Sequence, residues 1–378
     1  MSGGALPLDR RHQSEGDRLT KLLTLHTHGP LRIVVIGGGT GLSVVLRGLK
    51  EYVPAPAYAA AEAAPARLPH IEVTAVVTVT DDGGSSGRLR RELDVLPPGD
   101  IRSCMVALSE DETLLAKLFQ YRFDGGKGLK GHSFGNLFLT ALSQVTGDFA
   151  KAVAISSEVL ASRGRIFPST AAHVTLEAAL EDGSVVEGET KISRSKVPIR
   201  QIVLKPKRCR PLNETLAAIE QADVICLGPG SLYTSIIPNL LVDGIPEAIR
   251  RSAARKAYFC NLMWQPGETI NYSAADHVAA LHRHSMEGLA DTIVINTRPI
   301  TGARRRRYAA QQLYPVQNDY PRLGEMGLRV VGRNLLARGD KIRHSPQTTA
   351  AVAVELAQEA RASRLGGRGP AAALGGGY

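Results

Sequence analysis

The chain has 378 residues and a net charge of +10, with 43% hydrophobic and 22% charged residues. This composition is ordinary for a soluble protein, and no run approaches the about 20 apolar residues of a membrane span. Aromatic residues make up only 5%, which argues against binding single-stranded nucleic acid by base stacking. The length allows one large α/β domain or two smaller domains.

The excess of basic residues has two explanations. One is a nucleic-acid partner, for which the four consecutive arginines at residues 304–307 are the candidate patch. The other is that basic residues surround a site for anionic small molecules, or simply solvate the surface. Because the sequence contains no DNA- or RNA-binding motif, we favour the second explanation.

We expect a single α/β domain at residues 31–363 between two disordered tails, residues 1–30 and 364–378. The first tail is charged and lacks the apolar stretch of a secretory signal. Residues 54–69 are rich in Ala and Pro and predict a surface insertion. The cysteines lie far apart with no C-x-x-C pair, which indicates a cytoplasmic protein and argues against a cysteine-based zinc site.

The first strong pattern is IVVIGGGTGLSVVLRG at residues 33–48. Its apolar start predicts a buried strand and its end an amphipathic helix. The turn between them comprises Gly37, Gly38, Gly39, Thr40 and Gly41. A strand, a glycine turn and a helix N-terminus favour phosphate binding, because backbone amides point outward and no Cβ intervenes. The turn matches neither the dinucleotide fingerprint nor the P-loop, so a tight turn without a ligand is the alternative.

A second apolar, β-branched strand at residues 71–80 ends in a similar loop. That loop begins with Asp81, Asp82, Gly83, Gly84 and Ser85. Because the carboxyl ends of parallel strands meet at one edge, we expect it beside the first loop. Asp81 or Asp82 would accept a hydrogen bond from a ribose hydroxyl, or hold Mg²⁺ against phosphate oxygens. An Asp-Gly turn with a helix cap is the alternative.

Three more loops are expected at the same edge of the sheet. Their candidate groups are Asn136 in the glycine-rich loop 125–136, Gly228, Gly230 and Ser231 after a strand at 223–227, and Asn261 after a strand at 256–260. We expect the hydroxyls of Ser231, Tyr233, Thr234 and Ser235 to converge there as well. His132, in the loop 125–136, is more often structural than catalytic at such a position.

Alternating residues around Asp182-Gly183 predict a hairpin, and a strand at 199–206 extends it into a β-rich excursion over about 171–206. A further strand at 291–297 and a helix over about 346–363 complete the pattern. The predicted fold is therefore a Rossmann-like α/β fold, with a mostly parallel sheet flanked by helices and a β-hairpin excursion.

Three local predictions concern packing. Leu114, Leu115, Leu118 and Phe119 would form the core-facing stripe of a helix. Asp148 would cap a helix at 148–162, and Asn213 would cap the helix at 213–222. The apolar stretch from Ser235 to Val242 offers an interface for a homodimer.

Six motifs, in this order, resemble the YvcK/CofD-like family over residues 31–360: GGGTGLSVVLRGLK, VTVTDDGGSSGRLRREL, PPGDIR, GHSFGN, GPGSLYTSIIPNLL and CNLMWQPGET. One branch of this family comprises bacterial gluconeogenesis factors, and the other the 2-phospho-L-lactate transferases of deazaflavin coenzyme synthesis. DDGGSSGRLR and GPGSLYTS resemble the first branch. That resemblance implies a cleft for a UDP-sugar and a role in cell shape and envelope synthesis during gluconeogenic growth.

The resemblance also implies that Tyr308 and Arg343 help hold the nucleotide-sugar. An arginine suits a diphosphate and a tyrosine ring suits a uracil. Trp264 departs from the family, in which a small polar residue is usual. We therefore rank three functions: UDP-sugar binding first, a Mg²⁺-dependent phosphotransferase second, and nucleic-acid binding last.

Overall fold

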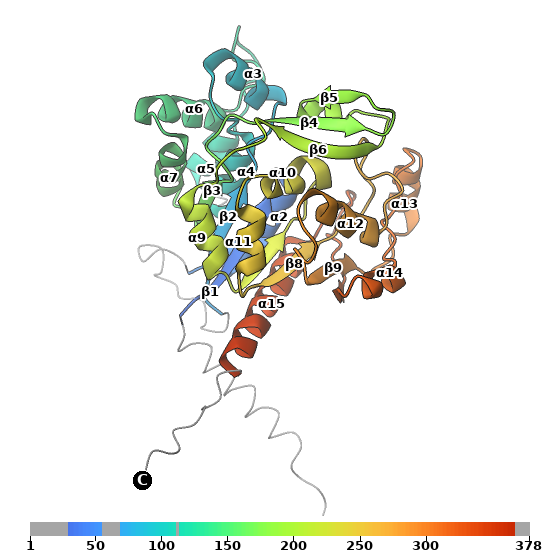
Figure 1. Cartoon of the computed structure of the whole chain (residues 1–378). Helices are drawn as coiled ribbons and strands as arrows, with labels where there is room; N and C mark the ends of the chain where they lie inside the picture. The colour runs from blue at the N-terminus through green and yellow to red at the C-terminus, as the bar shows by residue number, and fades with distance from the viewer. Residues whose placement is uncertain (1–28, 55–68, 111–112, 367–378) are drawn as a thin grey trace, which may run out of the picture.

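The computed structural model describes residues 29–54, 69–110 and 113–366 (Figure 1). The predicted tails and the insertion at 54–69 lie almost wholly outside these ranges. The described residues form a seven-stranded sheet and a three-stranded sheet. Every strand pair of the large sheet is parallel, and both pairs of the small sheet are antiparallel. The predicted fold class is confirmed.

The elements have the following bounds. The large sheet contains β1 (Leu31–Gly37), β2 (Ile71–Val77), β3 (Arg165–Pro168), β7 (Val224–Leu227), β8 (Arg255–Phe259), β9 (Thr292–Asn296) and β10 (Arg329–Arg333). The small sheet contains β4 (Thr175–Leu180), β5 (Val185–Glu187) and β6 (Ile199–Lys205). Its first two strands form the predicted hairpin, and β6 pairs with β4.

The helices of the first half are α2 (Gly39–Leu49), a 3₁₀ turn (Lys50–Tyr52), α3 (Gly84–Leu93), α4 (Gly99–Leu108), α5 (Leu114–Gln120), α6 (Phe134–Thr146), α7 (Phe149–Val159) and α8 (Glu189–Ile192). The second half has α9 (Asn213–Gln221), a π-helical segment (Leu232–Ile236), α10 (Ile237–Leu240), α11 (Ile245–Arg251), α12 (Ala274–His284), α13 (Gly302–Ala309), α14 (Tyr320–Glu325) and α15 (Pro346–Gly366). None of the helices in the described ranges has the length and apolar character needed to cross a bilayer.

The order of the large sheet is β10-β9-β8-β7-β1-β2-β3. The chain therefore starts in the middle, moves outward through β2 and β3, and then returns to the other side of β1 with β7. Connections on the two sides of the β1–β7 pair run in opposite directions. In open α/β sheets, ligands bind in the crevice that such a reversal leaves at the carboxyl ends of the strands.

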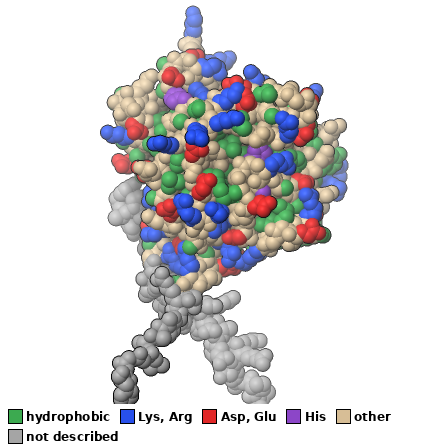
Figure 2. All heavy atoms as spheres, viewed as in Figure 1, with side chains coloured by type: hydrophobic (Ala, Val, Ile, Leu, Met, Phe, Trp, Pro, Cys, Tyr) green, Lys and Arg blue, Asp and Glu red, His purple; other side chains and the backbone are tan. Residues whose placement is uncertain are grey.

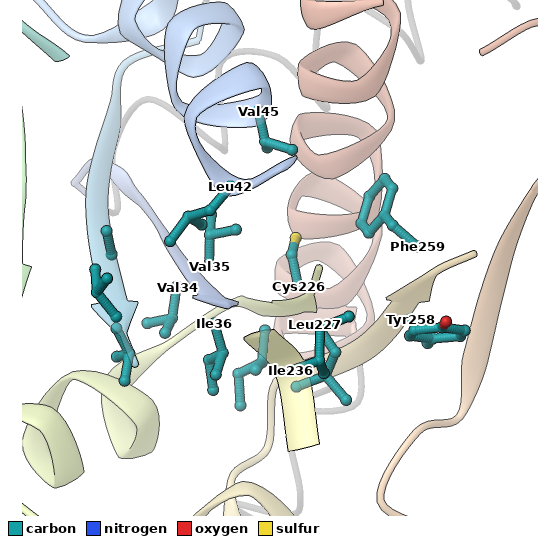
Figure 3. Close-up of a cluster of buried hydrophobic side chains, with 14 of the residues drawn as sticks. Val34, Val35, Ile36, Leu42, Val45, Cys226, Leu227, Ile236, Tyr258 and Phe259 are labelled. Carbon is teal, nitrogen blue, oxygen red and sulfur yellow. The ribbon is translucent and has the colours of Figure 1, made fainter. Parts of the chain in front are cut away.

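The core is built on both faces of the central strands, which explains their nearly continuous β-branched sequence. Val35 points toward α2 and α15, whereas Ile36 points to the opposite face, where it meets Ile236 (Figure 3). All three side chains are fully buried. Burial of such a side chain contributes roughly 1.5–3 kcal/mol relative to leaving it exposed.

A buried carboxylate fastens the last helix to the sheet. Asp223, at the start of β7, is 2% exposed and accepts a hydrogen bond of 2.7 Å from the backbone N–H of Arg32 in β1. It also pairs with the guanidinium groups of Arg361 and Arg364 in α15. Because a buried carboxylate is costly without partners, α15 is held across the amino ends of β1 and β7.

Two of the packing predictions are wrong in part. Of the predicted stripe, Phe119 is fully buried as expected, but Leu114 and Leu118 are 83% and 38% exposed, because Ala116 and not these leucines shares the inner face of the short helix α5 with Phe119. Asn213 is the first residue of α9 rather than its cap, and no side chain caps that helix. By contrast, Asp148 caps α7 by accepting a hydrogen bond of 3.0 Å from the backbone N–H of Lys151.

The stretch from Ser235 to Val242 cannot serve as the subunit interface that its apolar sequence suggested. Apart from the half-buried Leu241, its residues are buried within this chain. They cross the face of the large sheet, where the π-helical segment contacts β1 and α10 contacts β6 and α12. The apolar side chains are therefore explained by the core, and a homodimer stays a prediction without support from this stretch.

Candidate functional site

A cleft of about 410 Å³ opens at the carboxyl ends of β1, β7 and β8. The walls are Gly38–Gly41 after β1, Pro229–Ser231 after β7, Asn261–Gln265 after β8, residues 342–344 before α15, and Glu189 of α8. A smaller pocket of about 310 Å³ adjoins the cleft beyond β8 and β9 and shares Asn261 and Leu262 with it. The cleft therefore lies where the reversal of strand order predicts a ligand.

Two larger hollows, of about 610 and 650 Å³, lie elsewhere in the molecule. The first is lined by the amino ends of β1 and β2, at the opposite edge of the sheet, and the second by residues of α12 and α14. If volume alone decided, one of these two hollows would be the candidate ligand site. Neither is bordered by the glycine-rich loops that follow β1 and β7, so we take the cleft at the carboxyl edge as the candidate site.

The loops after β1 and β7 contact each other through their backbones. A Cβ atom at Gly41 would collide with the carbonyl of Pro229 and the Cα of Gly230, so this position needs glycine. Gly39 and Gly228 adopt φ angles of +61° and +77°, which glycine accepts without strain. These glycines are therefore required by the protein's own geometry, in addition to any role toward a ligand.

A half-buried acid lies directly behind the first loop. Asp100, in α4, packs against Gly38 and accepts a hydrogen bond from the backbone N–H of Gly39. Burial, and then the negative charge of Asp81, raises the pKa of Asp100 to about 7. The Gly39 amide is thus already used within the protein, and only the other amides of this loop are left for an anion.

A chain of hydrogen bonds forms the opposite wall. The Asn261 side-chain amide donates to Gln265 Oε1 at 2.8 Å, and Gln265 Nε2 donates to Ser231 Oγ at 2.9 Å. These bonds join the loops after β7 and β8. Trp264 also lines the cleft, and its indole N–H donates to the carbonyl of Tyr272 at 3.1 Å. This wall presents amide and hydroxyl groups in a fixed arrangement.

The segment before α15 brings Arg343 and His344 to the cleft. Arg343 is exposed at its rim. His344 Nε2 lies 3.1 Å from the carbonyl oxygen of Cys260, to which it must donate, and burial lowers the pKa of this histidine to about 4. Tyr308 is not among the described residues that line the cleft, and its hydroxyl accepts a hydrogen bond of 3.2 Å from the backbone N–H of Ile342. Tyr308 therefore supports the segment that carries Arg343.

The loop after β2 is not among the described residues that line the cleft, and its half-buried carboxylates bond to other parts of this chain. Asp81 Oδ1 accepts from the Gly83 N–H at 2.9 Å, and burial raises the pKa of Asp81. Asp82 Oδ1 accepts from both the N–H and the hydroxyl of Thr190, at 2.9 and 2.6 Å. Gly84 starts α3 with a φ of +45°. The two carboxylates are thus occupied by this chain's own donors.

The glycine-rich loop 125–136 supports the β2 loop from behind. His132 Nδ1 and Ser85 Oγ are 2.9 Å apart, and both residues are buried. Asn136 Oδ1 accepts from Arg102 Nε at 2.9 Å, while the Ser133 side chain caps α6. None of these side chains is among the described residues that line the cleft.

The expected Mg²⁺ site does not fit this geometry. Within residues 29–54, 69–110 and 113–366, no three His, Cys, Asp or Glu side chains are grouped so that they could hold a metal ion. Asp82 already accepts two hydrogen bonds through one oxygen. We therefore derive no step through a metal.

The hydroxyls of Tyr233 and Thr234 turn away from the cleft, contrary to our expectation. Tyr233 pairs with the hydroxyl of Tyr272 at 2.7 Å, and Thr234 donates to Glu268 Oε1 at 3.0 Å. Glu268 is 6% exposed and also accepts from the Tyr233 N–H, and burial raises its pKa to about 7. Of the four hydroxyls considered, those of Ser231 and Ser235 border the cleft.

The arginines at 304–307 lie on α13, where Arg304 donates to the carbonyl of Ala337 at 3.3 Å. The other three are exposed. On the face shown in Figure 2, basic and acidic side chains are interspersed rather than gathered by sign. This face offers no extended basic surface of the kind that tracks a phosphate backbone.

Comparison with known proteins decides the family. A family profile described as 2-phospho-L-lactate transferase CofD matches residues 33–336. The chain belongs to the CofD family. This CofD-family chain is 46% identical over 314 residues to the gluconeogenesis factor of Halalkalibacterium halodurans, covering 83% of this chain and 92% of that relative. It is 46% identical over 329 residues to the gluconeogenesis factor of Bacillus subtilis, covering 87% and 98%.

A crystal structure of a Bacillus halodurans protein has the same fold, with a TM-score of 0.80 at 45% identity. The match covers 86% of this chain and 100% of that one. The resemblance drawn from the six motifs is confirmed. Within the CofD family, this chain is similar to proteins named gluconeogenesis factor over most of its length.

Proposed function

We propose that the cleft at the β1–β7 crevice binds a UDP-sugar. In this proposal the protein is a cytoplasmic gluconeogenesis factor that is needed for cell shape and envelope synthesis on gluconeogenic carbon sources. One observation carries the proposal: the glycine loops after β1 and β7 meet at the point where strand order reverses, with Arg343 at the rim. This is the position at which open α/β sheets bind phosphorylated ligands.

The chemistry of the walls suits a nucleotide-sugar. Free amides at the start of α2 and the guanidinium of Arg343 favour a diphosphate. The linked amide and hydroxyl groups of Ser231, Asn261 and Gln265 can hydrogen-bond to sugar or base. The adjoining pocket beyond β8 and β9 gives room for an elongated ligand.

The same walls favour binding over nucleophilic catalysis. His344 donates through Nε2 to the carbonyl of Cys260, so that nitrogen is not available to activate a serine or cysteine. Among the described lining residues, no other histidine or cysteine faces Ser231 or Ser235. A regulatory protein that reports the level of a nucleotide-sugar fits this arrangement.

Calorimetry with UDP-glucose and UDP-N-acetylglucosamine tests the proposal. We expect binding by the wild type, and at least about tenfold weaker binding by Arg343→Ala, because a charge-assisted hydrogen bond is worth roughly 1.5–3 kcal/mol. Arg338→Ala, at another exposed arginine of the same segment, is the control and should bind normally. Absence of binding at millimolar ligand, or unchanged affinity of Arg343→Ala, contradicts the proposal.

The second candidate is phosphotransfer, which the description of the matching family profile favours. The oxygen of a deazaflavin alcohol would form a new bond to the phosphorus of a nucleotide-linked phospholactyl group. The bond from that phosphorus to the nucleotide would break, and the proton of the alcohol would pass to a carboxylate at the cleft. Product formed within hours from donor, acceptor and Mg²⁺ would establish this activity and displace the binding-only role.

A further inference from the structure

Glu189 reaches the cleft from outside the large sheet. It is the first residue of α8, which connects β5 and β6 of the small sheet. The other walls follow β1, β7 and β8 or precede α15. Glu189 lines the same cavity as Gly38–Gly41, so a carboxyl group and the phosphate-binding amides border one cavity.

One oxygen of Glu189 lacks a hydrogen-bond partner. The side chain is partly exposed at the cleft, but its Oε2 atom is fully buried and receives no hydrogen bond from the described residues. Burial, and then the charges of Asp100 and Asp81, raises the pKa of Glu189 well above its usual value. Leaving such an oxygen unsatisfied costs about 1–3 kcal/mol, which is relieved when the side chain turns toward a ligand donor in the cleft.

The loop that carries Glu189 is held on two sides. Asp82 accepts two hydrogen bonds from Thr190, and its carboxylate fills the space where Gly188, at a φ of +96°, would carry a Cβ. On the other side, a Cβ at Gly267 would collide with the backbone of Ser193. The backbone at Glu189 is therefore fixed before any ligand binds, so that only the side chain has to move to make a contact, which lowers the entropic cost.

We propose that Glu189 is a specificity residue of this cleft and accepts a hydrogen bond from a sugar hydroxyl of the bound nucleotide-sugar. This inference rests on the proposed function. A sugar hydroxyl can donate to this carboxyl in either of its protonation states, whereas an ionised phosphate oxygen can only accept and would contact it only when the carboxyl carries a proton. Hexose and ribose both carry such hydroxyls, so the experiment must separate them.

Calorimetry should compare wild type and Glu189→Ala with UDP-glucose and with UDP. If the hexose supplies the hydroxyl, the variant loses about tenfold or more in affinity for UDP-glucose and keeps its affinity for UDP. If the ribose supplies it, both ligands lose affinity by the same factor. Glu187→Ala, at an exposed glutamate two residues away, should change neither.

Unchanged or tighter binding of UDP-glucose by Glu189→Ala would overturn this inference but not the proposed function. The carboxyl would then make no contact with the ligand or would repel it. Failure of the wild type to bind UDP-glucose would overturn the proposed function and this inference together. Because no described residue donates a hydrogen bond to Oε2, we expect the thermal midpoint of Glu189→Ala to equal or exceed that of wild type. A clear fall in the thermal midpoint would show that Glu189 stabilises the fold instead of contacting a ligand.

Discussion

The loops after β1 and β2 are similar in sequence, and both lie at the carboxyl edge of neighbouring strands. The first lines the cleft with Gly38–Gly41. The second turns inward, where Asp82 contacts Thr190 and Ser85 contacts His132. Glycine at the end of a strand therefore indicates a close approach, and in the first loop Gly41 meets the backbone of Pro229 and Gly230. What separates the two loops is that the first also borders a cavity, whereas side chains of the second bond to other parts of this chain.

The difference follows from strand order. The β1 loop borders the crevice where the chain reverses, whereas the β2 loop lies one strand further out, under the small sheet and loop 125–136. Polar residues that follow a strand are thus ligand contacts only when the neighbouring loops leave room for a ligand. Four substitutions test this difference between the two loops.

The largest effect is expected at Gly41. The Cβ of Gly41→Ala would collide with the backbone of Pro229 and Gly230, so we expect a loss of about 3 kcal/mol in unfolding free energy and the loss of ligand binding. Chemical denaturation and calorimetry measure both. Gly37→Ala is the matched control, because its nearest contact is an ordinary 3.8 Å from Leu42. Equal behaviour of the two variants would contradict the close contact between the loops.

Asp82→Ala should cost about 2 kcal/mol, because it leaves two donors of Thr190 without their charged acceptor. If Asp82 acts by holding α8, the variant also weakens UDP-glucose binding, and adding Glu189→Ala weakens it little further. Thr190→Val removes one of the two bonds and should show part of the loss. Fully additive effects of Asp82→Ala and Glu189→Ala would instead favour a direct contact of Asp82 with the ligand.

Asp100 should make stability depend on pH. Its pKa is raised to about 7 in the folded protein, so the folded state holds a proton that the unfolded state releases at lower pH. The contribution of Asp100 to the free energy of unfolding is complete below the usual pKa of an aspartate, about 4. It is lost as pH rises from there to about 7, by about 1 kcal/mol per pH unit. Asp100→Asn does not titrate, so its stability relative to wild type should rise from pH 4 to 7. A stability difference between Asp100→Asn and wild type that does not change with pH would contradict this prediction.

Ser85→Ala should have the smallest effect. It removes the 2.9 Å hydrogen bond to His132 and should cost about 1 kcal/mol of unfolding free energy. Because Ser85 does not line the cleft, UDP-glucose affinity should be unchanged within twofold in calorimetry. A tenfold loss of affinity would show that the β2 loop contacts the ligand after all.

Local sequence patterns predicted the parts of the fold that local physics controls. The β-branched runs of β1 and β2, the hairpin at Asp182-Gly183 and the cap at Asp148 depend on neighbouring residues, and all are observed. The exposed Leu114 shows the limit, because a helix of seven residues can bury either of two apolar faces. Which face is buried depends on neighbours that the local pattern does not contain.

The parts of the candidate site that directly follow a predicted strand could be predicted from the sequence. Gly38–Gly41, Ser231 and Asn261 reach the cleft as expected. Asp82 and Thr190 are 108 residues apart, and no periodicity relates them. Glu189 was missed for the same reason: it belongs to a hairpin excursion, and only the three-dimensional packing brings it to the phosphate loops. A glutamate between a glycine and a threonine was its local signal in the sequence.

The carboxylate of Asp223 links the order of synthesis to the completion of the fold. Strands β1 and β7 are translated well before α15, yet the guanidinium partners of Asp223 belong to that last helix. A nascent chain that ends before Arg361 would bury a negative charge without those partners, which is strongly destabilising. The middle of the sheet, which carries the candidate site, is therefore finished only when the final described helix leaves the ribosome.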